Sequence, residues 1–506
     1  MSDVNITDAI FAVAERSPHA VAVIDGVTPL SFRDLCAGVR LAASRFHQAG
    51  WRAGDVIGIS VGGSQVRHLV SSLALARSGI VQVSLPVGSP APLLLSSIRK
   101  MGISGVVSDA PLEAGIKSVV PTADWFSPEA NAAVADDVRG TGGDRLWIIT
   151  ETSGTTGEPK LVGITHSVED RHRKSRAPVF AHLPGERYIN LSGVRFLTGM
   201  KRAICCLSDG GVLSLPPAGF SYGQLLQWID RYNIRYLSCV PVHLHQLLRE
   251  VRSDCPRLPS LRILLSSAAA FPPAAVHEVR RRISPNFYIN YGASEAGPMA
   301  AATPDMLAAH PDCVGWPLDG IELEIVDDAD RPVPVGTSGH VRVRGPGVLS
   351  SYLRAAPEEQ SRVFRNGWYY LGDIGAKDDE GLVYLKGRAD EMMNFNGIMI
   401  SPAEIEVVLR EHPAVQDVAA FALPSPEHQD VPAAAIVSSQ ALPVDELARF
   451  CEQRLGVRMP RLFIRVGEIP KNPMGKVLRR ELVALAMADL QKNAGSGGGV
   501  ERGGQK

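Results

Sequence analysis

The alternation of short strand patterns with amphipathic helix patterns between Val21 and Val83 constrains the fold most strongly. Runs rich in β-branched residues are separated by stretches whose apolar residues recur at spacings of three and four. In order, they read AVAVIDG, LSFRDLCAGVRLAASRFHQAG, VIGISV, HLVSSLALARSG and IVQVSL. Strands that alternate with helices predict βαβ units and a mostly parallel sheet. Ligands of such sheets bind outside the carboxyl ends of the strands.

A loop suited to anions follows a later strand pattern. The segment Glu151 to Lys160, ETSGTTGEPK, comes directly after the apolar run LWII. Its hydroxyl residues, two glycines and one lysine offer many donors, and glycine lets successive N–H groups converge on an anion. The spacing is not that of a Walker loop. A solvated turn is the simpler interpretation of these ten residues taken alone.

Two further strand patterns end in loops of the same kind. LRILL, from Leu261 to Leu265, leads into SSAAAFPP, and FYIN, from Phe287 to Asn290, leads into YGASEAG. We expect all three loops to share one crevice at the carboxyl ends of the strands.

The pattern changes after about Thr303. Short strands with intervening Gly and Pro (ELEIVDD, HVRVRGPG, GWYYLGD, LVYLKG) predict a small β-barrel or antiparallel subdomain. A strong helix start, Ser401-Pro-Ala-Glu404, then opens a unit of alternating helices and strands. In it we predict strands at VQDVAAFAL and LFIRVGEIP, helices at SPAE and VDELARFCEQRL, and a last helix from about Gly475.

Composition excludes several classes of protein. The charges are balanced, with 52 Lys and Arg against 53 Asp and Glu, which argues against a nucleic-acid partner. The sequence shows neither a signal peptide nor an apolar run of the roughly 20 residues that a membrane helix needs. We therefore expect a cytoplasmic protein with no membrane association. Seven cysteines without a Cys-x-x-Cys pair suggest reduced, mostly buried thiols.

Five motifs, taken in order, resemble those of the adenylate-forming superfamily of acyl- and aryl-CoA synthetases, nonribosomal peptide adenylation domains and luciferases. The motifs are TSGTTGEPK, NYGASEAG, YYLGDIG, GRADEMMNFNG and PKNPMGKVLRREL. The resemblance implies an α/β fold class: a large N-terminal domain of doubly wound α/β subdomains plus a small β-barrel, with a small mobile α+β C-terminal domain. We place these domains at residues 1–389 and 390–490, followed by a disordered Gly-rich tail at 491–506.

The resemblance also implies a reaction in two halves. A carboxylate attacks the α-phosphate of Mg-ATP to give an acyl-adenylate and pyrophosphate, and a thiol then usually takes the acyl group. Such a reaction needs cations and N–H groups around the phosphates, because positioning and charge stabilisation dominate phosphoryl-type catalysis. ATP and Mg²⁺ are the implied cofactors.

Site residues are implied position by position. Lys160 would lie near the β- and γ-phosphates, Glu295 would bind Mg²⁺, Arg388 would lie at ribose and phosphate, and Lys476 would reach the carboxylate and α-phosphate during adenylation. Taken alone, each has a simpler interpretation as a solvated charge. The remaining nucleotide and cofactor contacts are implied at Thr152, Ser153, Gly154, Thr155, Thr156, Gly157, Tyr291, Gly292, Ser294, Asp373 and Gly397.

Asp390 matches the hinge about which the C-terminal domain rotates between the two half-reactions. Hinges need only a few residues that absorb a φ/ψ change. The sequence also departs from the family at Leu161, at the SSAAAF segment, at His340 and at Asn394. None of these changes removes a catalytic group, and together they indicate a specialised member.

Arg195 stands near the position where the family often has histidine or, in amino-acid-activating domains, aspartate. Because a guanidinium suits carboxylates, we hypothesise that the small carboxylic acid substrate carries a second acidic or polar group. An internal ion pair of Arg195 is the alternative. The expected pocket residues are Arg195, Val240, Ser267, Ala268, Ala269 and Gly292.

The thiol acceptor stays open. The loop at Asn396 and Gly397 matches the border of a pantetheine tunnel, which free coenzyme A and a carrier-protein phosphopantetheine would both enter. Coenzyme A is our first expectation and loading of an acyl or peptidyl carrier protein the second, by a monomer or homodimer. A non-catalytic nucleotide- or acyl-binding protein is the alternative of another class, but binding alone would not require Lys476.

Overall fold

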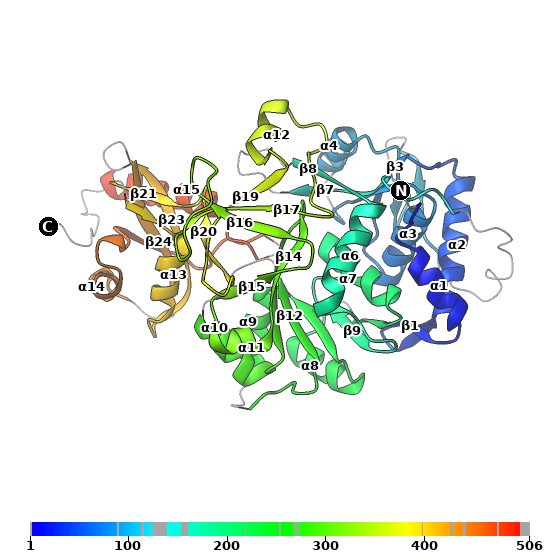
Figure 1. Cartoon of the computed structure of the whole chain (residues 1–506), viewed down its shortest axis with the longest axis horizontal. Helices are drawn as coiled ribbons and strands as arrows, with labels where there is room; N and C mark the ends of the chain where they lie inside the picture. The colour runs from blue at the N-terminus through cyan, green and yellow to red at the C-terminus, as the bar shows by residue number, and fades with distance from the viewer. Residues whose placement is uncertain are drawn as a thin grey trace.

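The computed structural model has a large N-terminal part and a smaller C-terminal part, coloured orange to red in Figure 1. It describes residues 3–88, 91–112, 116–122, 125, 139–152, 160–217, 219–251, 255–267, 271, 273–396, 398–425, 429–438, 442–472 and 475–495. Within these ranges the strands form three sheets.

The largest sheet has a parallel half and an antiparallel half. Its order is β16-β17-β19-β20-β15-β14-β13-β12-β11-β9-β10-β1-β2, with β18 paired to β19. The run from β1 through β10, β9, β11 and β12 to β13 is parallel, and β2 adds an antiparallel edge. The strands of this half are β1 (Val21–Asp25), β2 (Thr28–Ser31), β9 (Arg187–Asn190), β10 (Val212–Leu215), β11 (Tyr236–Cys239), β12 (Ile263–Ser267) and β13 (Phe287–Ala293).

Antiparallel strands continue this sheet by hydrogen bonding from β13, and they include the four expected after residue 303. They are β14 (Gly297–Ala302), β15 (Cys313–Pro317), β16 (Glu322–Val326), β17 (Gly339–Arg344), β18 (Phe364–Arg365), β19 (Trp368–Lys377) and β20 (Val383–Arg388). Two short helices, α11 (Pro304–Ala309) and α12 (Pro357–Val363), lie in their connections. One continuous ladder therefore joins the YGASEAG segment to the YLGD and GRAD segments.

The second sheet has the order β6-β5-β3-β4-β7-β8 and contains two of the three strands predicted between Val21 and Val83, whereas the first of them, β1, lies in the largest sheet. Its strands are parallel except for the final hairpin of β7 and β8. They are β3 (Val56–Ser60), β4 (Val81–Ser84), β5 (Gly105–Ser108), β6 (Ser118–Val119), β7 (Leu146–Thr152) and β8 (Lys160–Thr165).

Helices of the N-terminal part cover both sheets. They are α1 (Asp8–Arg16), α2 (Phe32–Gln48), α3 (Gln65–Arg77), α4 (Ala91–Met101), α6 (His166–Phe180), α7 (Leu197–Ser208), α8 (Tyr222–Arg231), α9 (Pro241–Glu250), α10 (Pro273–Glu278) and the π-helix η2 (Val279–Ile283). Helix α3 contacts β3, β4 and α2, and most of its residues are buried. A helix buried on all sides belongs to the interior, so the core lies between the two sheets.

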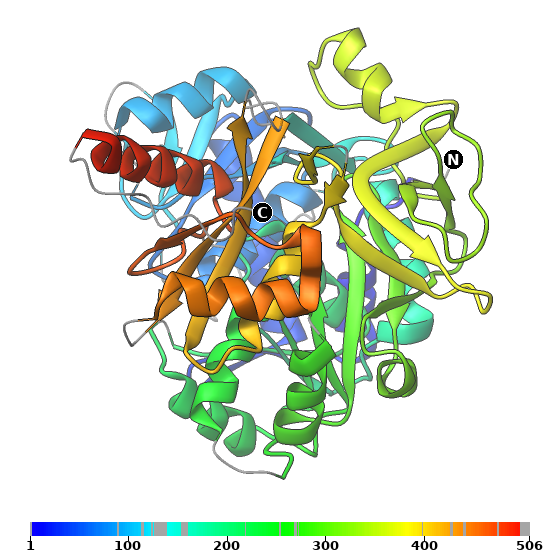
Figure 2. The ribbon, with the colours of Figure 1, turned by 90° about the vertical axis from the view of Figure 1, so that its left-hand side faces the viewer.

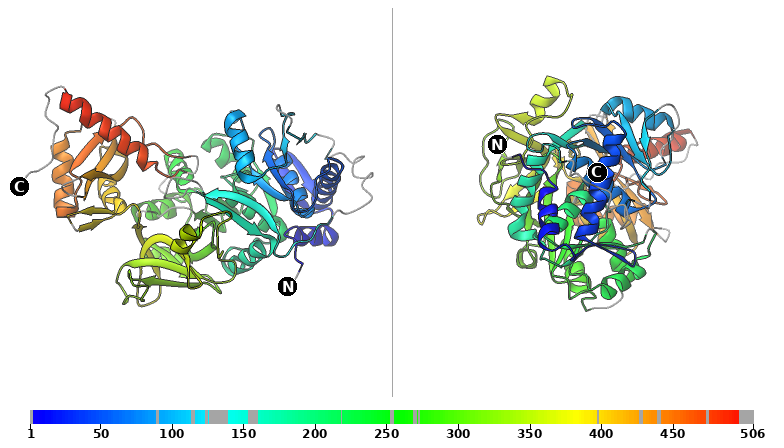
Figure 3. Two further views of the ribbon diagram at one scale, coloured as in Figure 1. Left: turned by 90° about the horizontal axis from the view of Figure 1, so that it is seen from above. Right: turned by 90° about the vertical axis from the view of Figure 1, so that its right-hand side faces the viewer.

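The C-terminal part is a separate α+β unit, seen face-on in Figure 2 and beside the larger part in the left view of Figure 3. Helices α13 and α14 cover one face of its sheet, and α15 covers the other. Its elements are β21 (Met393–Phe395), β22 (Ile398–Ile400), α13 (Pro402–Arg410), β23 (Val415–Ser425), β24 (Gln429–Ser438), α14 (Val444–Leu455), the 3-10 helix η3 (Gly456–Arg458), β25 (Leu462–Arg465) and α15 (Arg479–Gly495).

Several elements of this unit differ from the sequence predictions, and the short strands β21 and β22 are among those not predicted. Strand β24, QDVPAAAIVS, was not predicted, because alanine and proline disfavour strands. The last helix begins at Arg479 instead of Gly475, because a bridge between Lys471 and Val477 keeps the preceding segment extended. The predicted N-cap is confirmed, since Ser401 Oγ accepts a hydrogen bond from the Ala403 N–H.

Two expectations from composition are met in the described ranges. Six cysteines are buried and Cys255 is exposed. No described helix is long and apolar enough to cross a membrane.

Candidate active site

The predicted anion loop spans the tip of the β7–β8 hairpin. Thr152, the last residue of β7, lies opposite Lys160, the first residue of β8. The predicted phosphate-binding residues Ser153, Gly154, Thr155, Thr156 and Gly157 lie outside the described residues. The hairpin nevertheless fixes the position of Lys160.

Lys160 lies in a largely buried, paired position. Its Nζ is 3.1 Å from Oε1 of Glu359 in α12, and its side chain is 12% exposed. The same Nζ lies 4.9 Å from the ring centroid of Tyr352. A cation held by a carboxylate and an aromatic face is poised for an anionic ligand. Glu359 was not predicted, since nothing in the sequence around it suggests a site.

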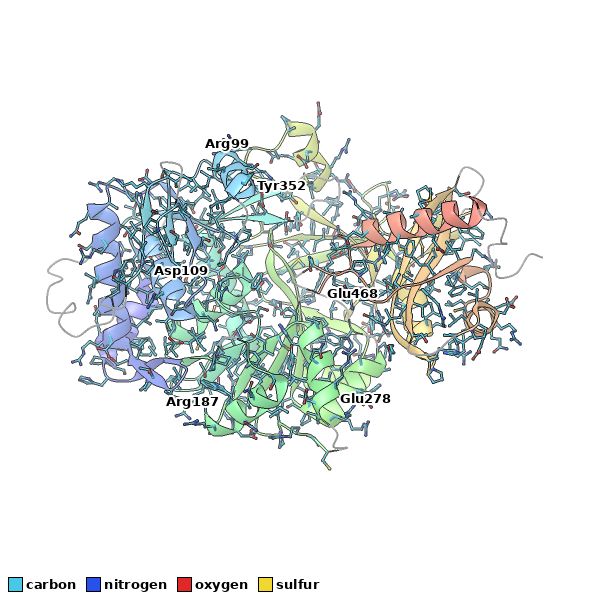
Figure 4. All side chains as sticks on the ribbon, turned by 180° about the vertical axis from the view of Figure 1, so that it is seen from behind. Arg99, Asp109, Arg187, Glu278, Tyr352 and Glu468 are labelled. Atoms are coloured by element: carbon cyan, nitrogen blue, oxygen red, sulfur yellow. The ribbon has the colours of Figure 1, made fainter. Side chains whose placement is uncertain are left out.

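Glu295 is buried between β13 and β14, and phenol groups hold its carboxylate. The Tyr352 hydroxyl donates to Oε1 over 3.0 Å, and the Tyr369 hydroxyl also bonds this carboxylate. Burial, followed by the Glu295 charge, raises the pKa of both phenols. Both therefore stay protonated as donors. Figure 4 labels Tyr352, and two residues further on Arg354 donates a hydrogen bond to the Lys100 carbonyl of α4 over 2.7 Å.

The donor set around Glu295 fits Mg²⁺ bound together with a nucleotide. Mg²⁺ in phosphate sites uses one or two carboxylates together with phosphate oxygens and water. The described ranges contain no cluster of three or more His, Cys, Asp or Glu that would form a self-sufficient metal site. A single buried carboxylate is consistent with Mg²⁺ that is bound together with phosphate oxygens and water.

Tyr291, Asp373 and Arg388 form a second cluster. The Tyr291 hydroxyl donates to Asp373 Oδ2, and Arg388 Nη1 donates to Oδ1 over 3.0 Å. Asp373 and Arg388 are direct cross-strand partners on β19 and β20. Gly372 has a φ of +76°, and a Cβ there would lie 3.0 Å from Arg388 Nη2. Glycine therefore leaves room for the guanidinium next to the carboxylate.

The predicted hinge residue is tied to this cluster. Asp390, exposed just after β20, accepts a hydrogen bond from Arg388 Nε over 3.1 Å. The predicted hinge residue is therefore bonded to the predicted ribose and phosphate arginine.

Gly292 is required by a close approach. The ladder between β13 and β14 shifts register between Tyr291 and Gly292. A Cβ on Gly292 would lie 2.5 Å from the Gly297 carbonyl oxygen. Ser294 lies in the turn between β13 and β14, one residue before Glu295.

Lys476 belongs to the C-terminal part and is exposed. Its N–H donates to Asn472 Oδ1 over 2.9 Å, which shapes the loop. In the described ranges no carboxylate pairs with its ammonium group. A Cβ on the neighbouring Gly475 would lie 3.3 Å from Val242 of α9, so this loop packs against the N-terminal part.

The predicted acyl pocket residues lie at the carboxyl ends of neighbouring parallel strands. Val240 follows β11, and Ser267, the last residue of β12, pairs with Asn290 of β13. Ala268 and Ala269 lie outside the described residues. The prediction omitted Asn290, whose buried Oδ1 accepts no hydrogen bond from the residues that the structure describes. Asn290 directly precedes Tyr291 in the NYGASEAG motif, and this position could have identified it as a candidate from the sequence.

Arg195 makes a hydrogen bond to a backbone carbonyl. Its Nη2 donates to the Gly62 oxygen over 3.2 Å. No carboxylate of the described ranges pairs with it, so they do not contain the internal ion pair that was the alternative. Asp109 instead accepts the N–H groups of Gly62 and Gly63.

The departure at Leu161 has a packing reason. Leu161 is buried in the apolar cluster beside β4, and its carbonyl accepts the Leu353 N–H over 2.8 Å. His340 makes an exposed contact of 3.0 Å to Asp328. Gly397, expected at the pantetheine tunnel, lies outside the described residues.

Family models match most of the chain. A model described as AMP-binding enzyme matches residues 10–353, and one described as AMP-binding enzyme C-terminal domain matches residues 404–476.

Curated relatives are similar over nearly their full length. The 2-succinylbenzoate–CoA ligase of Bacillus velezensis is 27% identical, with 94% of this chain and 97% of the relative covered. A fatty acid–[acyl-carrier-protein] ligase of Mycobacterium marinum is also 27% identical, with 96% and 99% covered.

A solved structure shows the same fold. O-succinylbenzoate coenzyme A synthetase from Bacillus subtilis, in complex with ATP and magnesium ion, matches with a TM-score of 0.83 at 24% identity. The match covers 94% of this chain and 99% of that one.

Proposed function

The chain belongs to the AMP-binding enzyme family of ATP-dependent acid–thiol ligases, and we propose that it makes an acyl-adenylate and passes the acyl group to coenzyme A. The acid's carboxylate attacks the α-phosphorus of ATP, and pyrophosphate leaves. The thiol sulfur then attacks the acyl carbon, and AMP leaves. The convergence of Tyr291, Asp373 and Arg388 from three separate motifs carries this proposal.

Asp373 is the residue that holds the ribose. Without a nucleotide its two oxygens accept from the Tyr291 hydroxyl and from Arg388. A carboxylate accepts about four hydrogen bonds, which leaves capacity for both ribose hydroxyls. Tyr291 presents its ring to the base, and Arg388 contributes positive charge at the phosphate side.

Lys160 and Glu295 serve the phosphates from opposite sides of Tyr352. Its ring faces the Lys160 ammonium, and its hydroxyl holds the Glu295 carboxylate. Glu295 would hold Mg²⁺, which when bound neutralises charge on the phosphate oxygens. To bind phosphate oxygens, Lys160 must break its ion pair with Glu359. The Glu359 carboxylate therefore takes the place of the anion until the nucleotide binds.

Lys476 delivers its charge from the C-terminal domain. Its exposed ammonium on a loop packed against α9 can approach the acid and α-phosphate at the ends of β11 and β12. Rotation about Asp390 then withdraws it for the thiol step. The domains of this account are residues 1–389 and 390–490.

The substrate is an acid with a second acidic or polar group. Arg195 lies half-buried on the segment before α7, bonded only to a carbonyl among the described residues. Its guanidinium therefore keeps donors for a carboxylate or another acceptor. A relative named for 2-succinylbenzoate, which carries such a second group, supports this assignment.

A carrier protein is the second candidate acceptor. Its support is the similarity to a fatty acid–[acyl-carrier-protein] ligase at the same identity as the CoA ligase. Both acceptors present the same pantetheine arm, so the loop around Asn396 serves either. Gly397 would border that arm.

Pyrophosphate release from Mg-ATP tests the proposal. We would screen mono- and dicarboxylic acids and substituted aromatic acids, each with and without coenzyme A. The expected result is release with at least one acid, followed by its CoA thioester. Release without a thioester would move the acceptor to a carrier protein. No release with any acid would contradict the function and favour a non-catalytic binding protein.

A further inference from the structure

Helices α6 and α7 bury a charged cluster that the proposed reaction does not use. We call Glu169, His172, Arg176 and Lys201 the interior cluster; each of these side chains is at most 8% exposed. Lys201 Nζ lies 2.8 Å from Glu169 Oε2, and Arg176 Nη2 lies 2.9 Å from Oε1. Buried ion pairs of this kind can often be replaced by apolar residues without loss of stability. Stability alone therefore does not explain the interior cluster, which suggests a role beyond packing.

The contacts of the ring fix the tautomer of His172. Burial, with the nearby Lys201 charge, lowers the pKa of His172 to about 4, so the ring is neutral at pH 7. Nε2 lies 2.9 Å from the Gly347 carbonyl oxygen, which can only accept, so Nε2 carries the proton. Nδ1 then accepts from Lys201 Nζ over 3.1 Å, and Glu169 Oε2 lies 3.4 Å from the same nitrogen.

The His172 ring fills a space left by two glycines. Gly297 and Gly347 have φ values of +68° and +94°. A Cβ would lie 2.4 Å from ring carbon Cδ2 if placed on Gly297, and 2.8 Å from it if placed on Gly347. The ring is thus clamped between the segment after Glu295 and the segment before Tyr352.

Those two segments hold Glu295 in place. The Leu349 N–H donates to the Glu295 carbonyl over 2.8 Å, and the Tyr352 hydroxyl donates to its carboxylate over 3.0 Å. One residue further on, the Leu353 N–H bonds to the Leu161 carbonyl next to Lys160. His172 bonds the start of this segment at Gly347. It therefore buttresses the backbone that positions both phosphate-site charges.

We propose that His172, oriented by Lys201 and Glu169, is a positioning residue that holds the segment 347–353 and through it the divalent-cation carboxylate of Glu295. This inference rests on the proposed function for the identity of the cation. The placement of His172 against the segment 347–353 rests only on contacts within this chain.

His172→Asn and His172→Gln separate the two contacts of the ring. The asparagine amide is placed like Nδ1 and keeps the Lys201 contact, but it is too short to reach Gly347. The glutamine amide is placed like Nε2 and retains a donor for the Gly347 carbonyl. His182→Asn is the matched control, because His182 is a buried histidine that packs on Tyr188 and Tyr236 instead.

Hydrogen exchange gives a readout independent of turnover. In His172→Asn, amides 347–353 should exchange about tenfold faster than in the parent, the effect of one lost neutral hydrogen bond. His172→Gln should restore most of the protection, and His182→Asn should leave this segment unchanged. Unchanged exchange in His172→Asn would overturn the inference.

The cation requirement gives the second readout. The Mg²⁺ concentration for half-maximal pyrophosphate release should rise about 10- to 100-fold in His172→Asn, as for other groups that support a metal ligand. The control should keep the parent value. If His172→Asn does not fold, Lys201→Met removes one of the two groups that orient the ring and should shift the same requirement. An unshifted requirement would overturn the inference.

The two proposals fail separately. A parent that releases no pyrophosphate contradicts the proposed function, whereas the exchange experiment still decides whether His172 holds the segment. An active parent with unchanged variants contradicts the positioning role alone.

Discussion

The proposed nucleotide residues of the large domain and the proposed catalytic lysine of the small domain are held in opposite ways. Asp373 and Glu295 are each bonded by side chains from other strands or loops before any ligand arrives. Lys476 is exposed on a loop shaped by backbone contacts to Asn472. One site is preorganised, and the other group can move.

This difference follows from what each group must do. Donors and acceptors that wait for a nucleotide work best when fixed, because no reorganisation is then needed during the reaction. A charge needed in only one half-reaction must be able to leave. Substitutions in the two regions should therefore differ in which half-reaction they affect.

Lys476→Ala should have the largest effect, and only on adenylation. Loss of an oriented charge-stabilising donor costs ~10²–10³ in rate, so acid-dependent pyrophosphate release should fall at least that far. Thioester formation from supplied acyl-adenylate should survive, because the domain has by then turned the lysine away. Rapid-quench assays of each half separate the two.

Lys471→Ala is the control for that experiment. Lys471 is also exposed on the same loop, but its ammonium pairs with Asp417. Both half-reactions should stay near the parent rate. Equal loss of both halves in Lys476→Ala would mean that the lysine is structural.

Asp373→Asn should weaken ATP use in the preorganised region. Arg388 would lose its charged partner, and the ribose would lose an acceptor. Hydrogen bonds to charged groups contribute about 1.5–3 kcal/mol, so kcat/KM for ATP should fall about 10- to 100-fold. Steady-state kinetics with ATP varied provides the measurement.

Asp378→Asn is the matched variant for Asp373. Asp378 also accepts from a tyrosine, Tyr384, but at the far end of β19. It should leave kcat/KM for ATP unchanged. A loss in both variants would indicate damage to the sheet, and no loss in Asp373→Asn would argue against the ribose assignment.

Arg195→Ala should have the smallest effect on rate and should alter selectivity. The preference for acids with a second anionic group over monocarboxylic acids should drop about tenfold, the scale of one hydrogen bond to a charged group. Arg187→Ala is the control, because Arg187 bonds the Tyr232 carbonyl at the opposite end of β9. It is labelled in Figure 4. An unchanged acid profile would refute the assignment of Arg195.

Much of the parallel part could be predicted from sequence because its signals are local. The strand and helix patterns from Val21 to Val83 match β1, α2, β3, α3 and β4, since hydrophobic periodicity reflects burial directly. The helix at Ser401 was predictable from its cap. Strand β24 was not, because its pairing with β23 overrides the weak strand preference of alanine.

The candidate site residues were predicted from motifs, and their partners in the structure were not. Tyr352, Glu359 and His172 lie outside every quoted motif and reach the site by long-range packing. Only spatial proximity identifies such residues, because a single tyrosine, glutamate or histidine has no local pattern. Gly297 and Gly347 are the sequence features most closely related to the position of His172, because they leave room for its ring.

The transfer of an acid oxygen to AMP tests the central claim most directly. We would supply the best acid of the screen with both carboxylate oxygens as oxygen-18, together with Mg-ATP and coenzyme A, and weigh the AMP by mass spectrometry. If the carboxylate attacks the α-phosphorus, each AMP carries a single labelled oxygen. Unlabelled AMP, or label in inorganic phosphate with ADP as product, would contradict the account.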